Sequence, residues 1–537
     1  MAGRIDARTL KQALKEPGEL ALLDVRETGA YSLGHPLFAV PVPYSRLELE
    51  IERLVPHRET PVVVFDGGEG FADTAARRLE TMGYTDVKVL EGGAPAWKAA
   101  GYTLFEGVNV PSKTFGEVVE IVRHTPRIKA RELIEMQQRG EDLVIVDGRT
   151  WEEYRRFNIP GGVSLPNGEL VLHIDGIAPN PKTKIVVNCA GRTRSIIGAQ
   201  TLIDWGVPNE VVALENGTQG YWLEGIPIEH GAGRRAPTGD KSADALSRKR
   251  ERARTHAERH GVEFASAETV AALASDASRT TYLLDVRTAE EFAADALPGF
   301  AHAPGGQLQQ ATDQWVGVRG ARIVLSDLGE LVRAPMVAAW LRQLGHQAIV
   351  LSDGASARDT LQASGQASGL TATRGRAFDP ARIRMREVSP TEVAAVLDRG
   401  QQGQVIDVRP SMSYRDGHID GATWSIRQRL AADLRDASKP VVLVADELGI
   451  AALAALDLAE AGCGDIAVLK GGMKAWVGEG RAVVATPTVP SDAECIDFVF
   501  HTLGRNEGNL DSARAYLAWE IGLVDQLDAD ERAVFRL

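Results

Sequence analysis

The chain has 537 residues, of which 44% are hydrophobic and 25% charged, and its formal net charge is −13 at pH 7. This length excludes a single hydrophobic core, because such cores stop growing at roughly 250–300 residues. The excess of acidic side chains argues against a nucleic-acid-binding protein, since such domains usually carry a basic surface.

The cysteines and the apolar segments narrow the class further. Cys189, Cys463 and Cys495 are few and far apart in the sequence, which indicates neither a disulfide framework nor a zinc site. The first twenty residues lack the apolar segment of a signal peptide, and no run approaches the roughly 18 apolar residues of a membrane span. We therefore expect a cytoplasmic protein that needs no metal or cofactor and binds neither membrane nor nucleic acid.

An apolar run that ends in Asp-x-Arg occurs four times along the chain. Each run predicts a buried strand that reaches the C-terminal edge of a parallel sheet. The repeats follow one another at intervals of 123, 138 and 122 residues, which are too long for a solenoid and fit whole domains. The four aspartates are Asp24, Asp147, Asp285 and Asp407.

The same order of elements surrounds each Asp-x-Arg motif. A helical pattern precedes the first apolar run, and a turn, a second apolar run, an alanine-rich helix and a short final strand follow it. This alternation predicts α/β domains, each with a mainly parallel sheet flanked by helices. The helices that precede the motif are predicted at 6–14, 129–137, 266–274 and 389–397. The second apolar runs lie at 61–66, 184–189, 321–327 and 440–446.

The repeats divide the chain into four predicted domains, which we call first to fourth, and a tail. The domains span 1–110, 125–230, 258–370 and 385–485. The basic segment 231–261 between the second and third domains is interpreted as a solvated linker or an exposed helix. Residues 491–537 have helical apolar spacing at 498–504 and 513–527. We expect them to form a helical tail that packs on a domain or on a second subunit.

The residue that ends the second apolar run differs between the repeats. It is Asp66, Cys189, Asp327 and Asp446 in chain order. At the position of Arg194, the other three loops have Phe71, Val332 and Ala451 when they are aligned on that residue. Only the second repeat thus joins a thiol to two guanidinium groups. Its loop continues after the cysteine with Ala190, Gly191, Arg192, Thr193, Arg194 and Ser195.

This combination predicts a nucleophile inside an anion-binding loop. The reactive form of cysteine is the thiolate, and a free thiol titrates near ~8.5. A strand-to-helix turn directs several N–H groups to one point, and the helix N-terminus adds positive potential. We expect Arg192 and Arg194 to add charge, to hold Cys189 as a thiolate at pH 7 and to receive an anionic substrate. The alternative is that Cys189 is a small buried hydrophobe, but the sister loops form the turn without a cysteine. Cys463 and Cys495 lack basic neighbours and are expected to pack in the core.

These motifs together resemble those of the rhodanese family of sulfurtransferases, in a form with four tandem rhodanese-like domains that is similar to thiosulfate sulfurtransferase. The resemblance rests on the Asp-x-Arg strand ends, on the active-loop sequence CAGRTRS, and on GHIDGA at 417–422 and FNIPGG at 157–162. EGGAPAW at 91–97 and KGGMKAW at 470–476 complete it. It covers most of residues 1–485 but not the tail. It implies a sheet of about five parallel strands with helices on both faces.

The resemblance also implies a role for each residue of the loop. Cys189 is the nucleophile and persulfide carrier, and Arg194 orients the loop and binds the anion. The N–H groups from Ala190 to Ser195 cradle the outer sulfur. Asp147 and Arg149 brace the loop from the neighbouring strand. The second domain is then catalytic, and the first, third and fourth domains, with their aspartate loops, are inactive.

Two questions stay open at this point. The donor is a small anion, either thiosulfate or a low-molecular-weight persulfide such as that of glutathione, and the acceptor is cyanide or a thiol. Many such loops place glycine three residues after the cysteine, whereas here Gly191 comes two after it, so the preferred donor is undecided. The alternative function is a sulfur relay or scaffold that passes sulfur to a protein partner. A phosphatase is less consistent with the sequence, because Arg194 follows Cys189 by five residues rather than the six of related phosphatases.

Overall fold

Four parallel sheets with one shared strand order form the framework of the protein. The computed structural model describes residues 2–364, 378–383, 385–398 and 403–537, so 365–370 of the predicted third domain and 399–402 of the fourth lie outside the described residues. In each sheet the strands run in the order first, fifth, fourth, second, third. The first two sheets contain β1 (Gly3–Ile5), β2 (Ala21–Asp24), β3 (Val40–Pro41), β4 (Val62–Phe65), β5 (Val87–Leu90), β6 (Arg127–Ile128), β7 (Leu143–Asp147), β8 (Val163–Ser164), β9 (Lys184–Asn188) and β10 (Val211–Leu214). The other two contain β11 (Glu263–Ala265), β12 (Thr281–Asp285), β13 (Ala301–His302), β14 (Arg322–Ser326), β15 (Gln347–Leu351), β16 (Arg386–Val388), β17 (Gln404–Asp407), β18 (Thr423–Trp424), β19 (Val441–Val444) and β20 (Ile466–Leu469).

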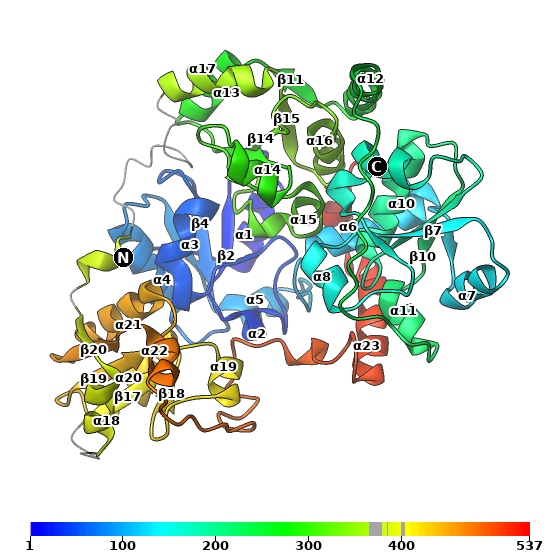
Figure 1. Cartoon of the computed structure of the whole chain (residues 1–537). Coiled ribbons are helices and arrows are strands. Elements are labelled where there is room, and N and C mark those ends of the chain that lie inside the picture. Colours follow the sequence, from blue (N-terminus) through cyan, green and yellow to red (C-terminus); the bar gives the residue numbers. More distant parts are fainter. Residues whose placement is uncertain (1, 365–377, 384, 399–402) are drawn as a thin grey trace.

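Helices cover both faces of these sheets (Figure 1). The first two domains and the segment that joins them contain α1 (Ala7–Ala13), α2 (Thr28–Tyr31), α3 (Leu47–Leu54), α4 (Ala72–Thr81), α5 (Gly93–Ala99), α6 (Val110–Arg123), α7 (Ala130–Gln138), α8 (Trp151–Arg156), α9 (Leu170–Ile177), α10 (Thr193–Trp205) and α11 (Gly217–Leu223). The rest of the chain contains α12 (Ala243–Arg259), α13 (Ala267–Ser275), α14 (Ala289–Ala294), α15 (Gly305–Gln310), α16 (Arg333–Gln343), α17 (Arg358–Ala363), α18 (Pro390–Asp398), α19 (Ser411–Asp416), α20 (Leu430–Asp433), α21 (Leu448–Glu460), α22 (Gly472–Gly478), α23 (Leu510–Ile521) and α24 (Ala529–Ala533). The predicted fold class is confirmed: four mainly parallel sheets are flanked by helices, and a helical tail follows.

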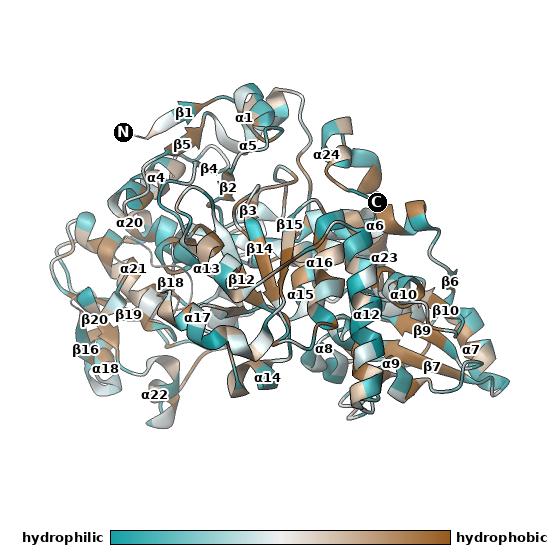
Figure 2. Ribbon diagram, turned by 90° about the horizontal axis from the view of Figure 1, so that it is seen from above, coloured by the Kyte–Doolittle hydropathy of each residue, from teal (hydrophilic) through white to brown (hydrophobic). Residues whose placement is uncertain are grey.

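The central strands are continuous apolar runs because helices bury them on both sides. Every residue of β2 and of β4 is buried, and Figure 2 shows the apolar strands enclosed by helices with polar outer faces. The parallel register aligns the ends of neighbouring strands. Asp147 at the end of β7 pairs with Asn188 at the end of β9. The Asp-x-Arg motif and the residue that ends the second apolar run therefore meet at one edge of each sheet.

The domains pack against one another through apolar and polar contacts. One hydrophobic cluster joins Leu54 and Val55 of the first domain to Val316 and Val318 of the third. The Tyr282 hydroxyl of the third domain also donates to the Leu54 carbonyl. The basic linker predicted at 231–261 contains α12, and this helix packs against α16 of the third domain.

The tail returns from the fourth domain across the first domain to the second (Figure 1). Its helix α23 packs against α6 and α11. The helix predicted at 498–504 forms only a 3₁₀ turn at Phe500–Thr502, because the backbone is already extended at Leu503, with a ψ of 126°. No helix among the described residues is long and apolar enough to cross a membrane.

We expect Arg427→Met to lower the free energy of unfolding by about 3 kcal/mol, because it would leave a buried carboxylate with only the more distant Arg78, at 3.7 Å. Arg427 of the fourth domain donates to both carboxylate oxygens of Glu48 of the first domain, at 2.5 and 2.8 Å, and both side chains are buried. Urea unfolding tests this. The control is Arg46→Met at the same interface, because its pair with Glu447 is exposed and is expected to contribute less than about 1 kcal/mol. Equal losses in the two variants would contradict the expectation.

Candidate active site

Cys189 lies directly after β9, at the carboxyl edge of the second sheet. Three residues, Ala190 to Arg192, separate it from α10, which begins at Thr193. The Cys189 side chain is buried, with 3% of its surface exposed, and the Ser195 hydroxyl donates a hydrogen bond to its sulfur at 3.1 Å. The chain thus places the thiol at the N-terminal end of a 13-residue helix.

The start of α11 holds the backbone of this loop. The N–H and hydroxyl of Thr218 both donate to the Cys189 carbonyl, at 2.8 and 3.0 Å. Gly217 has a φ of +56°, and a Cβ on it would lie 2.4 Å from the Cys189 carbonyl oxygen. Only glycine allows this close approach, so the glycine that follows the last strand of the domain fixes the position of the Cys189 loop (Cys189–Ser195).

The Asp-x-Arg motif supports the same strand edge. Arg149 donates to both oxygens of Asp147 and, at 2.6 Å, to the Phe157 carbonyl. Asp147 also accepts a hydrogen bond at 3.3 Å from Asn188, the residue before the cysteine. Asp147 thus contacts the residue directly before Cys189. Arg149 instead holds the turn that follows β7. The same pattern, with an arginine that contacts a carbonyl eight residues on, recurs in all four repeats.

The backbone N–H groups of the Cys189 loop are available to bind an anion. Those of Ala190 to Arg194 donate no hydrogen bond to any residue that the structure describes. In the first domain, by contrast, the Asp66 carboxylate accepts hydrogen bonds from the N–H groups of Gly68, Gly70 and Ala72 at 2.8–2.9 Å.

The third domain repeats this arrangement. Asp327 accepts from the N–H groups of Leu331, Val332 and Ala334 at 2.9–3.0 Å. In two sister loops an aspartate carboxylate therefore accepts the hydrogen bonds of the loop N–H groups, whereas in the Cys189 loop no side chain among the described residues does so. In the fourth domain a single residue, Glu447, separates Asp446 from α21, so this loop is too short to wrap around an anion in the same way.

Arg194 lies at the second position of α10 and is buried. Its guanidinium donates to both oxygens of Glu153 at 2.6 and 2.7 Å. It also donates to the Gln307 side-chain oxygen of the third domain at 3.2 Å. Burial raises the pKa of the Glu153 carboxyl, but the charge and hydrogen bonds of Arg194 outweigh this and hold the pKa at about 2. The pair therefore stays ionised at neutral pH.

The structure corrects the role expected for Arg192. Its guanidinium donates to Glu117 at 2.7 Å through two nitrogens, and it also pairs with Glu120 at 2.5 Å. Both carboxylates belong to α6, so the side chain is committed to the helix that joins the first two domains. Arg192 holds the loop against α6, and its charge is neutralised there rather than offered to a substrate.

The tail helix α23 covers the Cys189 loop. The Thr193 hydroxyl donates to the Glu520 carboxylate at 2.8 Å. A Cβ on Gly191 would lie 3.1 Å from the other Glu520 oxygen and 3.3 Å from the Tyr516 ring. That second Glu520 oxygen is buried and has no hydrogen-bond partner among the described residues. The tail thus brings a carboxylate against the loop that carries the thiol.

Comparison with known families decides the class of this fold. The model of the rhodanese-like domain matches residues 6–100, 129–224 and 389–479, which together exceed half of the chain. The chain belongs to the rhodanese-like domain family. The third domain lies outside these matches, but its sheet has the same strand order as the other three.

Two relatives of this chain have names that state an activity. The crystal structure of a thiosulfate sulfurtransferase from Pseudomonas aeruginosa is 42% identical in sequence, with a TM-score of 0.87 over 100% of this chain and 99% of that one. The Mycobacterium tuberculosis protein SseB, which has a provisional thiosulfate sulfurtransferase name, is 30% identical over 142 residues. That match spans 24% of this chain and about half, 48%, of the relative. The full-length similarity supports a rhodanese-type transferase.

The ionisation of the thiol differs from the sequence-based expectation of a thiolate at pH 7. Burial raises the pKa of Cys189 above its ordinary value, and the charge of Arg194 and the hydrogen bond from Ser195 offset this only in part. The Glu520 carboxylate raises the pKa further. The expectation failed mainly because the thiol is buried, which disfavours its charged form. Arg192 is turned toward Glu117 and Glu120 and is not among the groups that lower the pKa.

We expect Glu520→Gln to speed alkylation of Cys189 by iodoacetamide several-fold at pH 7.5, because one negative charge beside the thiol is removed. In the unchanged protein the alkylation rate should keep rising with pH past 9, since the pKa is raised above its ordinary value. Mass mapping of the labelled cysteine measures the rate across the pH range. Asp511→Asn, an exposed change on the same helix, is the control. Superimposable pH profiles for all three proteins would contradict the expectation.

The structure also corrects which residue of the third domain corresponds to Arg194. Aligning the loops on their first residue places Val332 opposite Arg194. In the structure Arg333 takes the corresponding role, because it pairs with Glu291. Glu291 closes a capping box with Thr288, as Glu153 does with Thr150. The alignment failed because five residues separate Asp327 from α16, whereas three separate Cys189 from α10.

Several residues around the thiol were missed in the sequence. Glu153 had a local signal, since it stands at the third position of a helix whose cap is Thr150. Glu117, Glu120 and Gln307 lie on other elements, and nothing local links them to the loop. Cys463 and Cys495 are buried and unpaired, as expected of packing residues.

Proposed function

We propose that the protein is a sulfurtransferase that carries sulfane sulfur as a persulfide on Cys189. The second domain, around residues 125–230, is the catalytic unit, and the first, third and fourth domains are inactive in sulfur transfer. The donor is thiosulfate or a low-molecular-weight persulfide, and the acceptor is cyanide or a thiol. The free thiols fit a reducing compartment, so the proposed location is the cytoplasm.

The observation that carries this proposal is the open cradle of the Cys189 loop. Asp66 and Asp327 show where a short anionic side chain meets the N–H groups of such a loop. A persulfide on Cys189 extends the side chain by one atom and bears a negative charge on its outer sulfur. That sulfur can accept from the N–H groups of Ala190 to Ser195, which stabilise it as the sister loops stabilise a carboxylate.

The proposed cycle has two displacement steps. The Cys189 thiolate attacks the outer sulfur of thiosulfate, an S–S bond forms to the enzyme, and sulfite leaves with the electron pair of the broken S–S bond. Cyanide then attacks the outer sulfur of the persulfide. Thiocyanate leaves, and the Cys189 thiolate is regenerated, so charge and electrons balance in each step.

Arg194 supplies the fixed positive charge for both steps. Its guanidinium is held by Glu153 and Gln307 at the first turn of α10, and its charge lowers the pKa of Cys189 against the effect of burial. Arg192, Thr193 and Gly191 shape the loop through contacts with α6 and α23. Because α23 covers Cys189, donor and acceptor reach the sulfur only when the tail moves away from the loop.

A donor and acceptor panel tests the function and resolves its finer points. Thiosulfate and glutathione persulfide are each supplied with cyanide or glutathione as acceptor, and an aryl phosphate serves as the phosphatase probe. We expect turnover with at least one sulfur donor and none with the phosphate ester. Rapid loading of Cys189 without discharge to either small acceptor would favour the relay to a protein partner. Absence of loading by both donors would contradict the proposal.

A further inference from the structure

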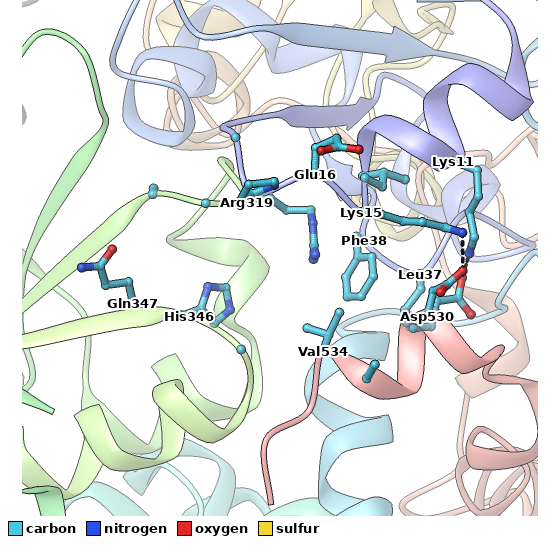
Figure 3. A pocket seen from close by; sticks show the side chains of 18 of the residues that line it. Lys11, Lys15, Glu16, Leu37, Phe38, Arg319, His346, Gln347, Asp530 and Val534 are labelled. Carbon is cyan, nitrogen blue, oxygen red and sulfur yellow. Dashed lines mark hydrogen bonds and ion pairs between the residues drawn. The ribbon is translucent and has the colours of Figure 1, made fainter. Parts of the chain in front are cut away.

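A cavity of about 550 Å³ lies between the first domain, the third domain and the tail. Its walls come from α1 and the turn before β3, from the strand ends around Arg319 and His346, and from α24 with the residues that follow it (Figure 3). No residue of the Cys189 loop lines it. The volume falls within the range of about 300–1,000 Å³ that is typical of small-molecule sites.

The lining of this cavity is basic although the protein is acidic. Three acidic side chains face six lysines and arginines, in a chain whose net charge is −13. The acidic residues are Glu16, Asp530 and Glu531. The basic residues are Lys11, Lys15, Arg279, Arg319, Arg342 and Arg536.

The acids of the tail are already paired with lysines in and just after α1. Lys11 contacts Glu531 at 2.8 Å, and Lys15 contacts Asp530 at 2.5 Å. Figure 3 shows these ion pairs on one side of the cavity, away from Arg319. They fasten the tail to the first domain and leave no acidic group of the tail to balance the arginines.

Three arginines of the lining have no such partner. The side chains of Arg319, Arg342 and Arg536 form neither an ion pair nor a hydrogen bond within the described part of the chain. The Arg536 N–H donates to the carbonyl of Gln343, the residue after Arg342, at 2.7 Å. This hydrogen bond joins the tail to the third domain beside both arginines. The unpaired charges thus gather where the third domain meets the tail.

Arg319 is the most constrained of the three. Its N–H donates to the Leu20 carbonyl at 3.0 Å, which joins the first and third domains. Its guanidinium lies over the Phe38 ring, with Cζ 3.7 Å from the ring centre, and Figure 3 shows it reaching into the cavity between Phe38 and His346. Burial lowers the pKa of Arg319 to about 10. A partly desolvated cation without a counter-charge is costly, and a bound anion would relieve that cost.

We propose that this cavity binds a small organic polyanion through Arg319, Arg342 and Arg536. The guanidinium group matches the oxygens of phosphates and carboxylates in a two-pronged geometry. The volume suits a molecule larger than an inorganic ion, with its charged groups against the arginines and its body against Phe38 and Leu37. Because the lining comes from two domains and the tail, such a ligand would bridge all three.

Isothermal titration of the full-length protein with pyrophosphate and with citrate tests this proposal. We expect at least one of these anions to bind, and we expect Arg319→Gln and Arg342→Gln each to weaken binding by at least about tenfold. Asp530→Asn, which removes a negative charge from the rim, should leave binding equal or stronger. Arg131→Gln is the matched control, because that exposed arginine pairs with Glu224 outside the cavity.

The two probes separate the chemistry of the ligand. Binding of pyrophosphate alone would assign phosphate esters, binding of citrate alone would assign carboxylates, and binding of both would assign polyanions in general. No heat of binding from either anion at about 10 mM, which is tenfold above a Kd of about 1 mM, would overturn the proposal. Equal binding in Arg319→Gln, Arg342→Gln and Arg131→Gln would also overturn it. If Arg319→Gln does not fold, Arg536→Gln replaces it, since Arg536 is exposed at the rim.

Discussion

Cys189→Ser is expected to lower sulfur transfer from thiosulfate to cyanide by at least about 10³-fold, because a serine hydroxyl neither ionises near neutral pH nor forms a persulfide. The change removes one chemical group and keeps the size of the side chain. The Ser195 hydroxyl and the carbonyl contacts of Thr218 stay available, so the loop should keep its shape. Thiocyanate formation at saturating donor measures the effect.

The other two cysteines provide matched controls for this change. Cys463 and Cys495 are buried in other parts of the molecule, and neither lies beside an arginine pair like that of the Cys189 loop. Cys463→Ser and Cys495→Ser are therefore expected to retain transfer within about twofold of the unchanged protein. Comparable losses in all three serine variants would contradict the assignment of Cys189 as the sole sulfur carrier.

Arg194→Met is expected to lower the same activity by about 10²-fold, the usual cost of removing one preorganised charge at a reacting anion. The guanidinium holds Glu153 in a partly buried ion pair and lowers the pKa of the thiol. Without it, the Glu153 carboxylate stays near the loop with only the more distant charge of Arg149 to balance it, and the thiol ionises at higher pH. The pH at which activity is half-maximal should therefore rise.

Arg194→Lys separates the charge from the two-pronged geometry. Lysine retains the positive charge but cannot contact both Glu153 oxygens and Gln307 in the same way. The activity of Arg194→Lys should therefore lie between that of the unchanged protein and that of Arg194→Met. Arg155→Met, on the neighbouring helix α8, is the control for arginine loss near the site. An unchanged pH profile in Arg194→Met would show that this residue acts only on stability.

The four-domain fold could be predicted because its signals are local and repeated. Each apolar run that ends in Asp-x-Arg became a central strand, since strands buried on both faces leave a continuous apolar run. The candidate catalytic thiol was also visible, because one loop departs from its three sister loops at Cys189. The short 3₁₀ turn at Phe500–Thr502 was missed, because apolar spacing alone does not show where the backbone leaves the helical region, here at Leu503.

The electrostatics of the site could not be predicted, because its partners are distant in the sequence. Arg192 and Glu117 are 75 residues apart, and Thr193 and Glu520 are 327 residues apart. Two arginines beside a cysteine suggested a lowered pKa, whereas burial of the thiol, helped by the Glu520 carboxylate of the tail, raises the pKa more than Arg194 lowers it. Charge near a residue in sequence is thus a poor guide to its pKa when packing decides the partners.

The most direct test is the intact mass of the protein after incubation with thiosulfate, for the unchanged chain and for Cys189→Ser. We expect a gain of one sulfur, about 32 Da, in the unchanged protein, its loss on addition of cyanide, and no gain in the variant. A sulfur adduct that persists in Cys189→Ser, or no adduct in the unchanged protein with either thiosulfate or glutathione persulfide, would contradict a persulfide cycle on Cys189.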